Sequence, residues 1–102
     1  MMKKLEVIVL PKPHHLKEFK QSLNSLRENL KKHCLSLIIY ESRDSNEFII
    51  SAQWDSIDKM REALSSDEFL ILSGAVNALC ENTVIRLDDK QLGNHISKLK
   101  SL

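Results

Sequence analysis

Three segments of this chain alternate in polarity, and each carries apolar side chains on both of its sides. They are "KLEVIVL" (4–10), "CLSLIIYES" (34–42) and "EFIISAQW" (47–54). Alternation over a few residues is typical of β-strands, whose successive side chains point to opposite faces of a sheet. A sheet that is apolar on both faces must be covered on both. This requirement constrains the fold more than any other feature of the sequence.

The segment after the first strand has the periodicity of a helix. Its apolar residues recur at steps of three and four, with polar residues between them, which predicts an amphipathic helix with one apolar stripe. The stripe consists of Leu16, Phe19, Leu23, Leu26 and Leu30.

A second helical region follows the third strand. Asp55 or Ser56 is expected to cap a short helix. Ser65 and Glu68 have the spacing of a capping box, which predicts a further helix that ends near Cys80. The segment "NTVIRLDD" (82–89) is the fourth predicted strand.

The predicted element order is βαββαβ, with a polar turn at 43–46 between the second and third strands. Right-handed crossovers then give a ferredoxin-like α+β fold, a four-stranded antiparallel sheet in the order 4-1-3-2 with both helices on one face. We expect one domain over residues 1–89. We expect a terminal tail over 90–102, either a short helix, since Leu92, Ile96 and Leu99 have helical spacing, or a frayed end.

Helices on one face leave the other face of this sheet open. One side of the strands carries Leu5, Val7, Val9, Phe48, Ile50, Ala52 and Trp54, and the other carries Ile8, Leu10, Ile38 and Ile49. The spacing does not decide which side meets the helices. A domain this small would expose a large apolar patch as a monomer, so we expect a homodimer that packs sheet against sheet.

Composition excludes several classes of partner. The chain has 102 residues, with 15 Lys and Arg against 14 Asp and Glu, so it lacks the clustered basic face of a nucleic-acid binder. No apolar run approaches the ~20 residues that span a bilayer. We therefore expect a cytoplasmic protein that binds neither nucleic acid nor membrane.

Cys34 and Cys80 are expected to be small buried hydrophobes. The four histidines lack the spacing of a metal site, and we expect neither a metal nor a cofactor.

A long central stretch resembles a known family. It reads "HCLSLIIYESRDSNEFIISAQWDSIDKMREALSSDEFLILSGAVNAL" (33–79). Its matching features are Cys34-Leu35, Phe48, Trp54, Ser56, and Ser66 with Phe69. They are similar to the signature of the antibiotic-biosynthesis monooxygenase family, a branch of the dimeric α+β-barrel superfamily, and the resemblance covers roughly residues 4 to 88. It implies that fold and a homodimer. The family includes cofactor-free oxygenases of aromatic quinols, haem-degrading enzymes, small-molecule isomerases and proteins of unknown role.

The sequence also departs from that family. Haem-degrading members carry an asparagine, a tryptophan and a histidine at positions that fall near Glu6, Ala63 and Ser73, and none of those residue types lies beside them here. Haem degradation is therefore not expected. His33 replaces the glycine that often precedes the Cys-Leu pair.

Trp54, the only tryptophan, has two interpretations. It falls on the same strand side as Phe48 and Ile50, so the leading one is a core residue that closes the end of the strand. The other is a substrate-stacking side chain.

Polar residues lie among aliphatic ones on the second side of the strands, as in a small-molecule pocket, where Ser51 and Gln53 could bind substrate. Glu6 and Arg86 fall on neighbouring predicted strands. Either they form a cross-strand ion pair, or Glu6 is a general base and Arg86 stabilises an oxyanion. In the second case Tyr40 and Ser73 would position a phenol.

The leading functional hypothesis is a cofactor-independent monooxygenase of a small aromatic or quinol. It needs a base, a cationic or hydrogen-bonding partner and a dry apolar site. The alternatives are a non-catalytic dimeric module that binds a small apolar molecule, and an isomerase of a small hydroxy-ketone.

Overall fold

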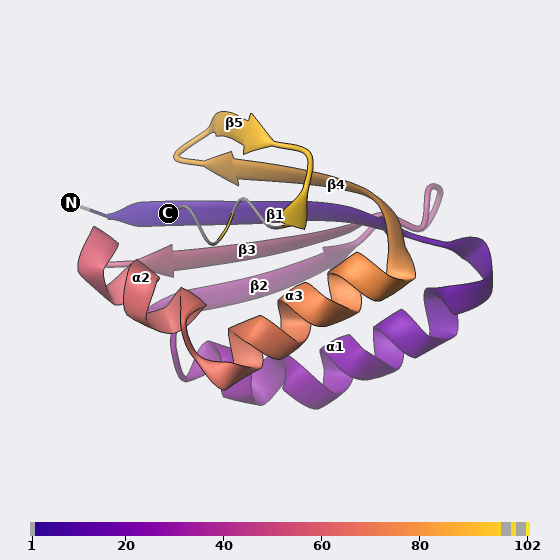
Figure 1. Ribbon diagram of the computed structural model, residues 1–102, viewed down its shortest axis with the longest axis horizontal. Coiled ribbons are helices and arrows are strands. Elements are labelled where there is room, and N and C mark those ends of the chain that lie inside the picture. The colour runs from indigo at the N-terminus through magenta and orange to yellow at the C-terminus, as the bar shows by residue number, and fades with distance from the viewer. Residues whose placement is uncertain (1, 97–98, 100–101) are drawn as a thin grey trace.

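A computed structural model describes residues 2–96, 99 and 102 of the chain. Figure 1 shows one sheet with the helices along it. In chain order the elements are β1 (Lys3–Pro11), the 3₁₀ turn η1 (Pro13–His15), α1 (Leu16–Lys31), β2 (Ser36–Glu41), β3 (Phe48–Trp54), α2 (Ile57–Leu64), α3 (Asp67–Leu79), β4 (Cys80–Leu87) and β5 (Lys90–Gly93). None of the described helices is long and apolar enough to cross a bilayer.

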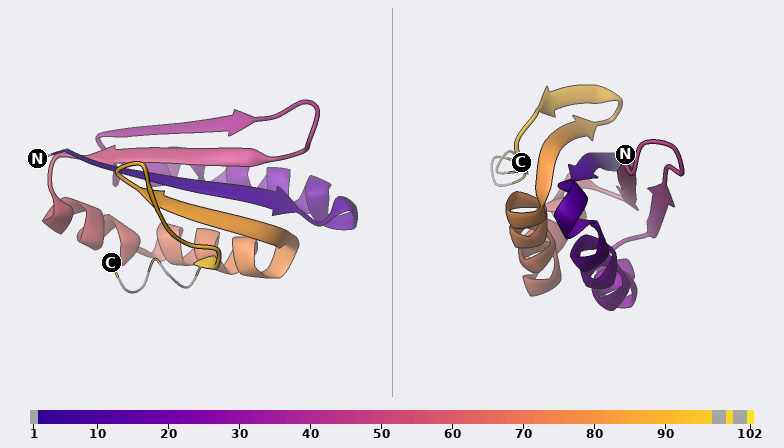
Figure 2. Two further views of the ribbon diagram at one scale, coloured as in Figure 1. Left: turned by 90° about the horizontal axis from the view of Figure 1, so that it is seen from above. Right: turned by 90° about the vertical axis from the view of Figure 1, so that its right-hand side faces the viewer.

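The sheet has five strands in the order β2-β3-β1-β4-β5, and every neighbouring pair is antiparallel. The predicted α+β class and the order 4-1-3-2 are therefore confirmed, with one strand added at the edge. The end-on view in Figure 2 shows α1 and α3 on the same face of the sheet. The opposite face has no helix over it among the described residues.

The added strand, β5, lies where we expected a helix or a frayed tail, so that expectation is wrong for residues 90–93. Asp88 and Asp89 connect β4 to β5, and their φ angles are 50° and 69°. Two successive left-handed residues form the tight turn that matches the twist of a β-hairpin. The Asp88 carboxylate accepts hydrogen bonds of 3.0 Å from the Lys4 backbone N–H and from Lys3 Nζ, which fixes the turn to β1.

The core lies between the sheet and the helices. The side of the strands that begins with Leu5 faces the helices, since its residues are buried. The apolar stripe predicted for α1 is confirmed, because Phe19, Leu23, Leu26 and Leu30 are buried against this side. Beyond β5 the chain turns back to the core, where Ile96 and Leu99 are buried.

Two serines begin the helices of the second half. Ser56 caps α2, and its hydroxyl accepts a hydrogen bond from the Lys59 backbone N–H. The predicted capping box was wrong by one residue, because Ser66 is the cap of α3 and accepts from the Phe69 N–H. Ser65 instead ends α2, where its hydroxyl donates to the Arg61 carbonyl oxygen at 2.9 Å.

Candidate functional site

The polar residues predicted as a site lie on two different faces of the sheet. Glu6, Tyr40, Ser51, Gln53 and Arg86 are on the side of the strands that points away from the helices. They share this open face with exposed apolar side chains, of which Ile38 is 46% accessible, and Tyr40 itself is 53% accessible. Trp54 and Ser73 are on the helix side. One molecule bound to a single chain therefore cannot touch both Tyr40 and Ser73.

Glu6 and Arg86 are direct cross-strand partners in the β1–β4 register. Within the described part of the chain, no ion pair joins them, and the Arg86 guanidinium instead donates to the Asp89 carbonyl oxygen at 3.2 Å. Ser51 is the partner of Glu6 on β3. Beside them the open face has a shallow hollow of about 410 Å³, lined by Glu6, Tyr40, Glu41, Ser42, Glu47 and Ile49.

Trp54 is only 2% accessible and packs in the core. Its ring lies 6.1 Å from that of Phe69, and its indole N–H donates to the His33 carbonyl oxygen at 2.8 Å. The apolar ring is therefore buried by the protein, and its N–H has a hydrogen-bond partner within the protein. This packing agrees with the leading interpretation of Trp54 as a core residue.

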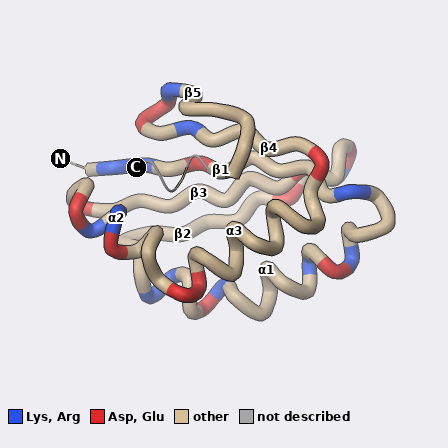
Figure 3. The backbone as a smooth tube through the Cα atoms, viewed as in Figure 1, with Lys and Arg blue, Asp and Glu red and all other residues tan. Residues whose placement is uncertain are grey.

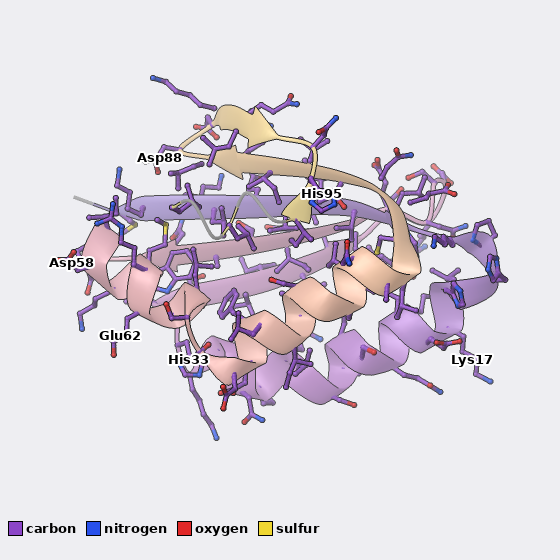
Figure 4. The ribbon with its side chains drawn as sticks, in the orientation of Figure 1. Lys17, His33, Asp58, Glu62, Asp88 and His95 are labelled. Carbon is purple, nitrogen blue, oxygen red and sulfur yellow. The ribbon has the colours of Figure 1, made fainter. Side chains whose placement is uncertain are left out.

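A second pocket, of about 290 Å³, lies between α3 and residues that follow β5, and its residues Asn77 and His95 are exposed. We call it the α3 pocket. Its walls are mainly apolar, with Ser73, Asn77 and His95 as the polar groups. Its lining residues are Leu64, Leu70, Ser73, Gly74, Asn77, His95, Ile96 and Leu99. Figure 4 shows His95 beside the end of β5, above α3. A small apolar molecule with a polar group fits a pocket of this kind.

The α3 pocket has space for a ligand because the residues of α3 at this point, Ser73 and Gly74, are small. No heavy atom beyond the helix's own neighbouring backbone lies within 4 Å of the position that a Cβ on Gly74 would take. The Ser73 hydroxyl donates to the Phe69 carbonyl oxygen at 2.9 Å, which leaves its own lone pairs able to accept a hydrogen bond from a ligand. Ser73 is the only lining residue of this pocket that was predicted from the sequence as a site residue.

Asn77 and His95 escaped prediction because they are far apart in sequence. The available signal was local: Ser73, Gly74 and Asn77 interrupt an otherwise apolar helix at positions that share one face. Figure 3 shows that α3 carries no charged residue beyond its first turn. A helix that is apolar on most of its circumference needs cover on its outer side as well. Ile96 and Leu99 supply part of that cover.

A side-chain contact joins the connection between α1 and β2 to the first turn of α3. His33 Nε2 lies 2.7 Å from Glu68 Oε1, and both side chains are about one third exposed or less. The hydrogen bond with His33 holds the pKa of the Glu68 carboxyl below its ordinary value. This contact supports the helix packing and is separate from the α3 pocket.

Both thiols are partly buried in this fold. Burial raises the pKa of Cys34 to about 11 and that of Cys80 to about 12. Because the thiolate is the nucleophile, neither is suited to covalent chemistry near neutral pH. Among the residues that the structure describes, no three His, Cys, Asp or Glu side chains are grouped so that they could hold a metal ion.

The sequence profile of one family, described as antibiotic biosynthesis monooxygenase, matches residues 7–71. The chain belongs to this family. The match extends from β1 to the first part of α3, so it includes Leu64 and Leu70 of the α3 pocket but not the polar residues farther along. No curated protein matches the chain.

Solved structures share the fold of this monooxygenase-family chain at low sequence identity. The Rv0793 protein of Mycobacterium tuberculosis is 18% identical with a TM-score of 0.78, over 85% of this chain and 92% of that one. PA3566 of Pseudomonas aeruginosa is 23% identical with a TM-score of 0.72, over 89% and 91%. A crystal structure described as antibiotic biosynthesis monooxygenase is 18% identical with a TM-score of 0.76, over 87% and 97%. At these identities the likeness establishes the fold alone.

Proposed function

We propose that this chain is a cofactor-independent monooxygenase that acts on a small phenol or quinol bound in the α3 pocket. The observation that carries the proposal is the lining of that pocket, which combines an apolar wall with His95, Asn77 and Ser73. Membership of the monooxygenase family supports the reaction type. An apolar wall suits an aromatic ring, and the three polar groups suit its hydroxyl.

In this proposal His95 accepts the phenolic proton, and the resulting anion is electron-rich enough to react directly with oxygen. The Asn77 amide donates a hydrogen bond to the phenolate oxygen, and Ser73 Oγ accepts one from a second hydroxyl. For a hydroquinone the reaction is hydroquinone plus O₂ giving hydroxyquinone plus water. One oxygen atom enters the ring and the other leaves as water. The substrate supplies all four electrons, so the equation balances without a further reductant.

The open face is the competing location for the same chemistry. There Glu6 would be the base, Arg86 the oxyanion partner and Tyr40 the group that positions a phenol, with Ser51 and Gln53 as substrate contacts. The hollow beside Glu6 and Tyr40 is shallow and open to solvent in one chain. A second chain over this face would exclude water from it, which such chemistry requires.

We propose that the second chain is an identical one, packed sheet against sheet. The open face carries Ile8, Leu10, Ile38, Ile49 and Val84 over neighbouring strands, and the described helices cover only the opposite face. Light scattering at micromolar concentration should therefore give twice the 11.7 kDa mass of one chain. Ile38→Lys should shift the mass toward one chain, whereas Leu70→Lys on α3 should not. A native mass near one chain contradicts the dimer.

Oxygen uptake by chelator-treated protein tests the function and its location together. A panel of hydroquinones and polyphenols is offered to the native chain and to variants of each location. His95→Gln and Gly74→Leu remove the proposed base and fill the α3 pocket, whereas Glu6→Gln and Arg86→Ala change the open face. His14→Gln, an exposed histidine on η1, is the matched control for His95→Gln.

Saturable uptake that falls in His95→Gln and Gly74→Leu, and persists in His14→Gln and Glu6→Gln, is the expected result. Uptake that falls only in the open-face variants moves the reaction to the sheet. The competing function is a non-catalytic binding module, and it is favoured by the position of Glu6, Tyr40 and Arg86 outside the α3 pocket. Ligand binding without uptake above the spontaneous rate establishes that function instead.

A further inference from the structure

The α3 pocket continues into a second hollow along the same side of the molecule. The second hollow, of about 470 Å³, is lined by Arg61, Leu64, Ser65, Leu70, Leu99 and Leu102. Leu64, Leu70 and Leu99 line both hollows. Together they form one groove between α2, α3 and the described residues His95, Ile96, Leu99 and Leu102. The groove is apolar in its middle, and its polar side chains lie toward its two ends.

The two ends differ in chemistry. Asn77 and His95 are at the end within the α3 pocket, and Arg61 with Ser65 is at the other. Among the residues that the structure describes, none that lines either hollow is acidic. Asp58 and Glu62, the acidic neighbours of Arg61 on α2, do not line the groove, and Figure 4 shows them on the outer side of that helix. The groove therefore presents the permanent positive charge of Arg61 at one end and the polar side chains of Asn77 and His95 at the other.

Arg61 already holds an oxygen atom in this structure. Its Nε donates to the backbone oxygen of Leu102 at 2.6 Å. A guanidinium has five N–H donors in a planar fork that matches a carboxylate, so one contact through Nε leaves donors for a second oxygen ligand. The charge at this end of the groove is thus complementary to a carboxylate.

We propose that the substrate of the α3 pocket is an elongated aromatic carboxylic acid, with its hydroxyl at His95 and its carboxylate at Arg61. The proposal rests on the proposed function for the position of the hydroxyl. Leu70, in the part shared by both hollows, and Asn77, in the α3 pocket, are separated by ~10 Å along α3, from the rise of ~1.5 Å per residue. The groove is longer than this, because Arg61 lines only the second hollow, so its occupant needs a skeleton of at least two fused rings with its polar groups at opposite ends. A shorter, neutral phenol would leave the Arg61 end unfilled.

The matched probes are 6-hydroxy-2-naphthoate, its methyl ester and 2-naphthol, with Kd measured by calorimetry. The ester keeps the ring and the hydroxyl but removes the charge. We expect the native chain to bind the acid about tenfold more tightly than the ester, as one charge-assisted contact near the surface provides. Arg61→Gln should abolish this preference and leave the Kd of the ester unchanged. Lys59→Gln, which removes a charge from the same helix outside the groove, should retain it.

Equal Kd values for acid and ester in the native chain overturn the proposal, as does a preference that survives Arg61→Gln. These outcomes leave the proposed function intact if 2-naphthol and the ester bind and Gly74→Leu abolishes their binding. Failure of all three probes to bind overturns both the carboxylate site and the α3 pocket as a phenol site. The two proposals can therefore fail separately.

Discussion

Replacing Gly74 with alanine should stabilise the protein, although the change lies in the proposed pocket. Gly74 is in the interior of α3, where glycine is about 0.8–1 kcal/mol less favourable than alanine. The added methyl group meets no heavy atom within 4 Å apart from the helix's own neighbouring backbone, so no clash offsets the gain. The substitution should therefore raise the free energy of unfolding by about 0.8 kcal/mol. For a domain of this size that corresponds to about 3–6 °C in Tm.

Urea denaturation at a fixed protein concentration measures this difference, with the m-value expected to stay unchanged. Ala75→Gly is the matched control on the neighbouring residue, and it should destabilise by about 1 kcal/mol. If Ala75→Gly behaves so while Gly74→Ala lowers the stability, the space beside Gly74 is not open and the pocket described here is wrong. Gly74→Leu then separates the stability of α3 from ligand binding in the α3 pocket, because it should abolish naphthol binding without unfolding the protein.

Three further outcomes follow from individual contacts. Because the folded-state pKa of Glu68 lies below its unfolded value of about 4.5, the His33 contact contributes stability above that pH and loses it as the pH falls through the folded pKa. In acid titrations followed by fluorescence, Glu68→Gln should remove this part of the loss of stability, and an unchanged dependence of stability on pH would count against the contact. Cys34 and Cys80 should react with iodoacetamide far more slowly at pH 7.5 in the folded protein than in urea, and equal rates would contradict their burial. Trp54→Phe should cost about 2 kcal/mol in calorimetric unfolding, since it leaves the His33 carbonyl unpaired and a small cavity, and a neutral result would refute that packing.

The sequence was sufficient to predict the elements with long regular patterns. The leucine and phenylalanine stripe of α1 and the alternation of β3 are repeated often enough to outweigh local preferences. The short β5 was missed because its four residues have no alternating apolar pattern. Its turn depends on Asp88 and Asp89, which both adopt a left-handed conformation that is uncommon outside glycine, although aspartate tolerates it better than most residues.

The orientation of the sheet could not be predicted because both sides of the strands are apolar. For the same reason the sequence did not reveal that Glu6 and Tyr40 lie on the face of the sheet opposite to α3, the helix that carries Ser73. The shift of the α3 cap has a simpler origin. Ser65 and Ser66 are adjacent and both suit a cap, and only the end of α2 decides between them.

The α3 pocket depends on contacts that no local pattern contains. Leu64, Ser73 and His95 come from α2, α3 and the segment after β5, and the fold alone brings them together. A small residue such as Gly74 in an apolar helix is compatible with tight packing as well as with a cavity. The difference lies in what stands opposite it, which is a tertiary property.

The position of β1 in the middle of the sheet governs how the nascent protein folds. β1 is made first, yet its two neighbours are β3 and β4, and the Asp88 carboxylate that binds Lys3 and Lys4 comes 84 or more residues later. During synthesis one edge of an apolar strand therefore stays unpaired until β4 has left the ribosome. Pairing between such distant segments is slow, and an open strand edge can associate with other chains. Pairing of β4 with β1 is thus the step that ends the exposure of this edge of β1.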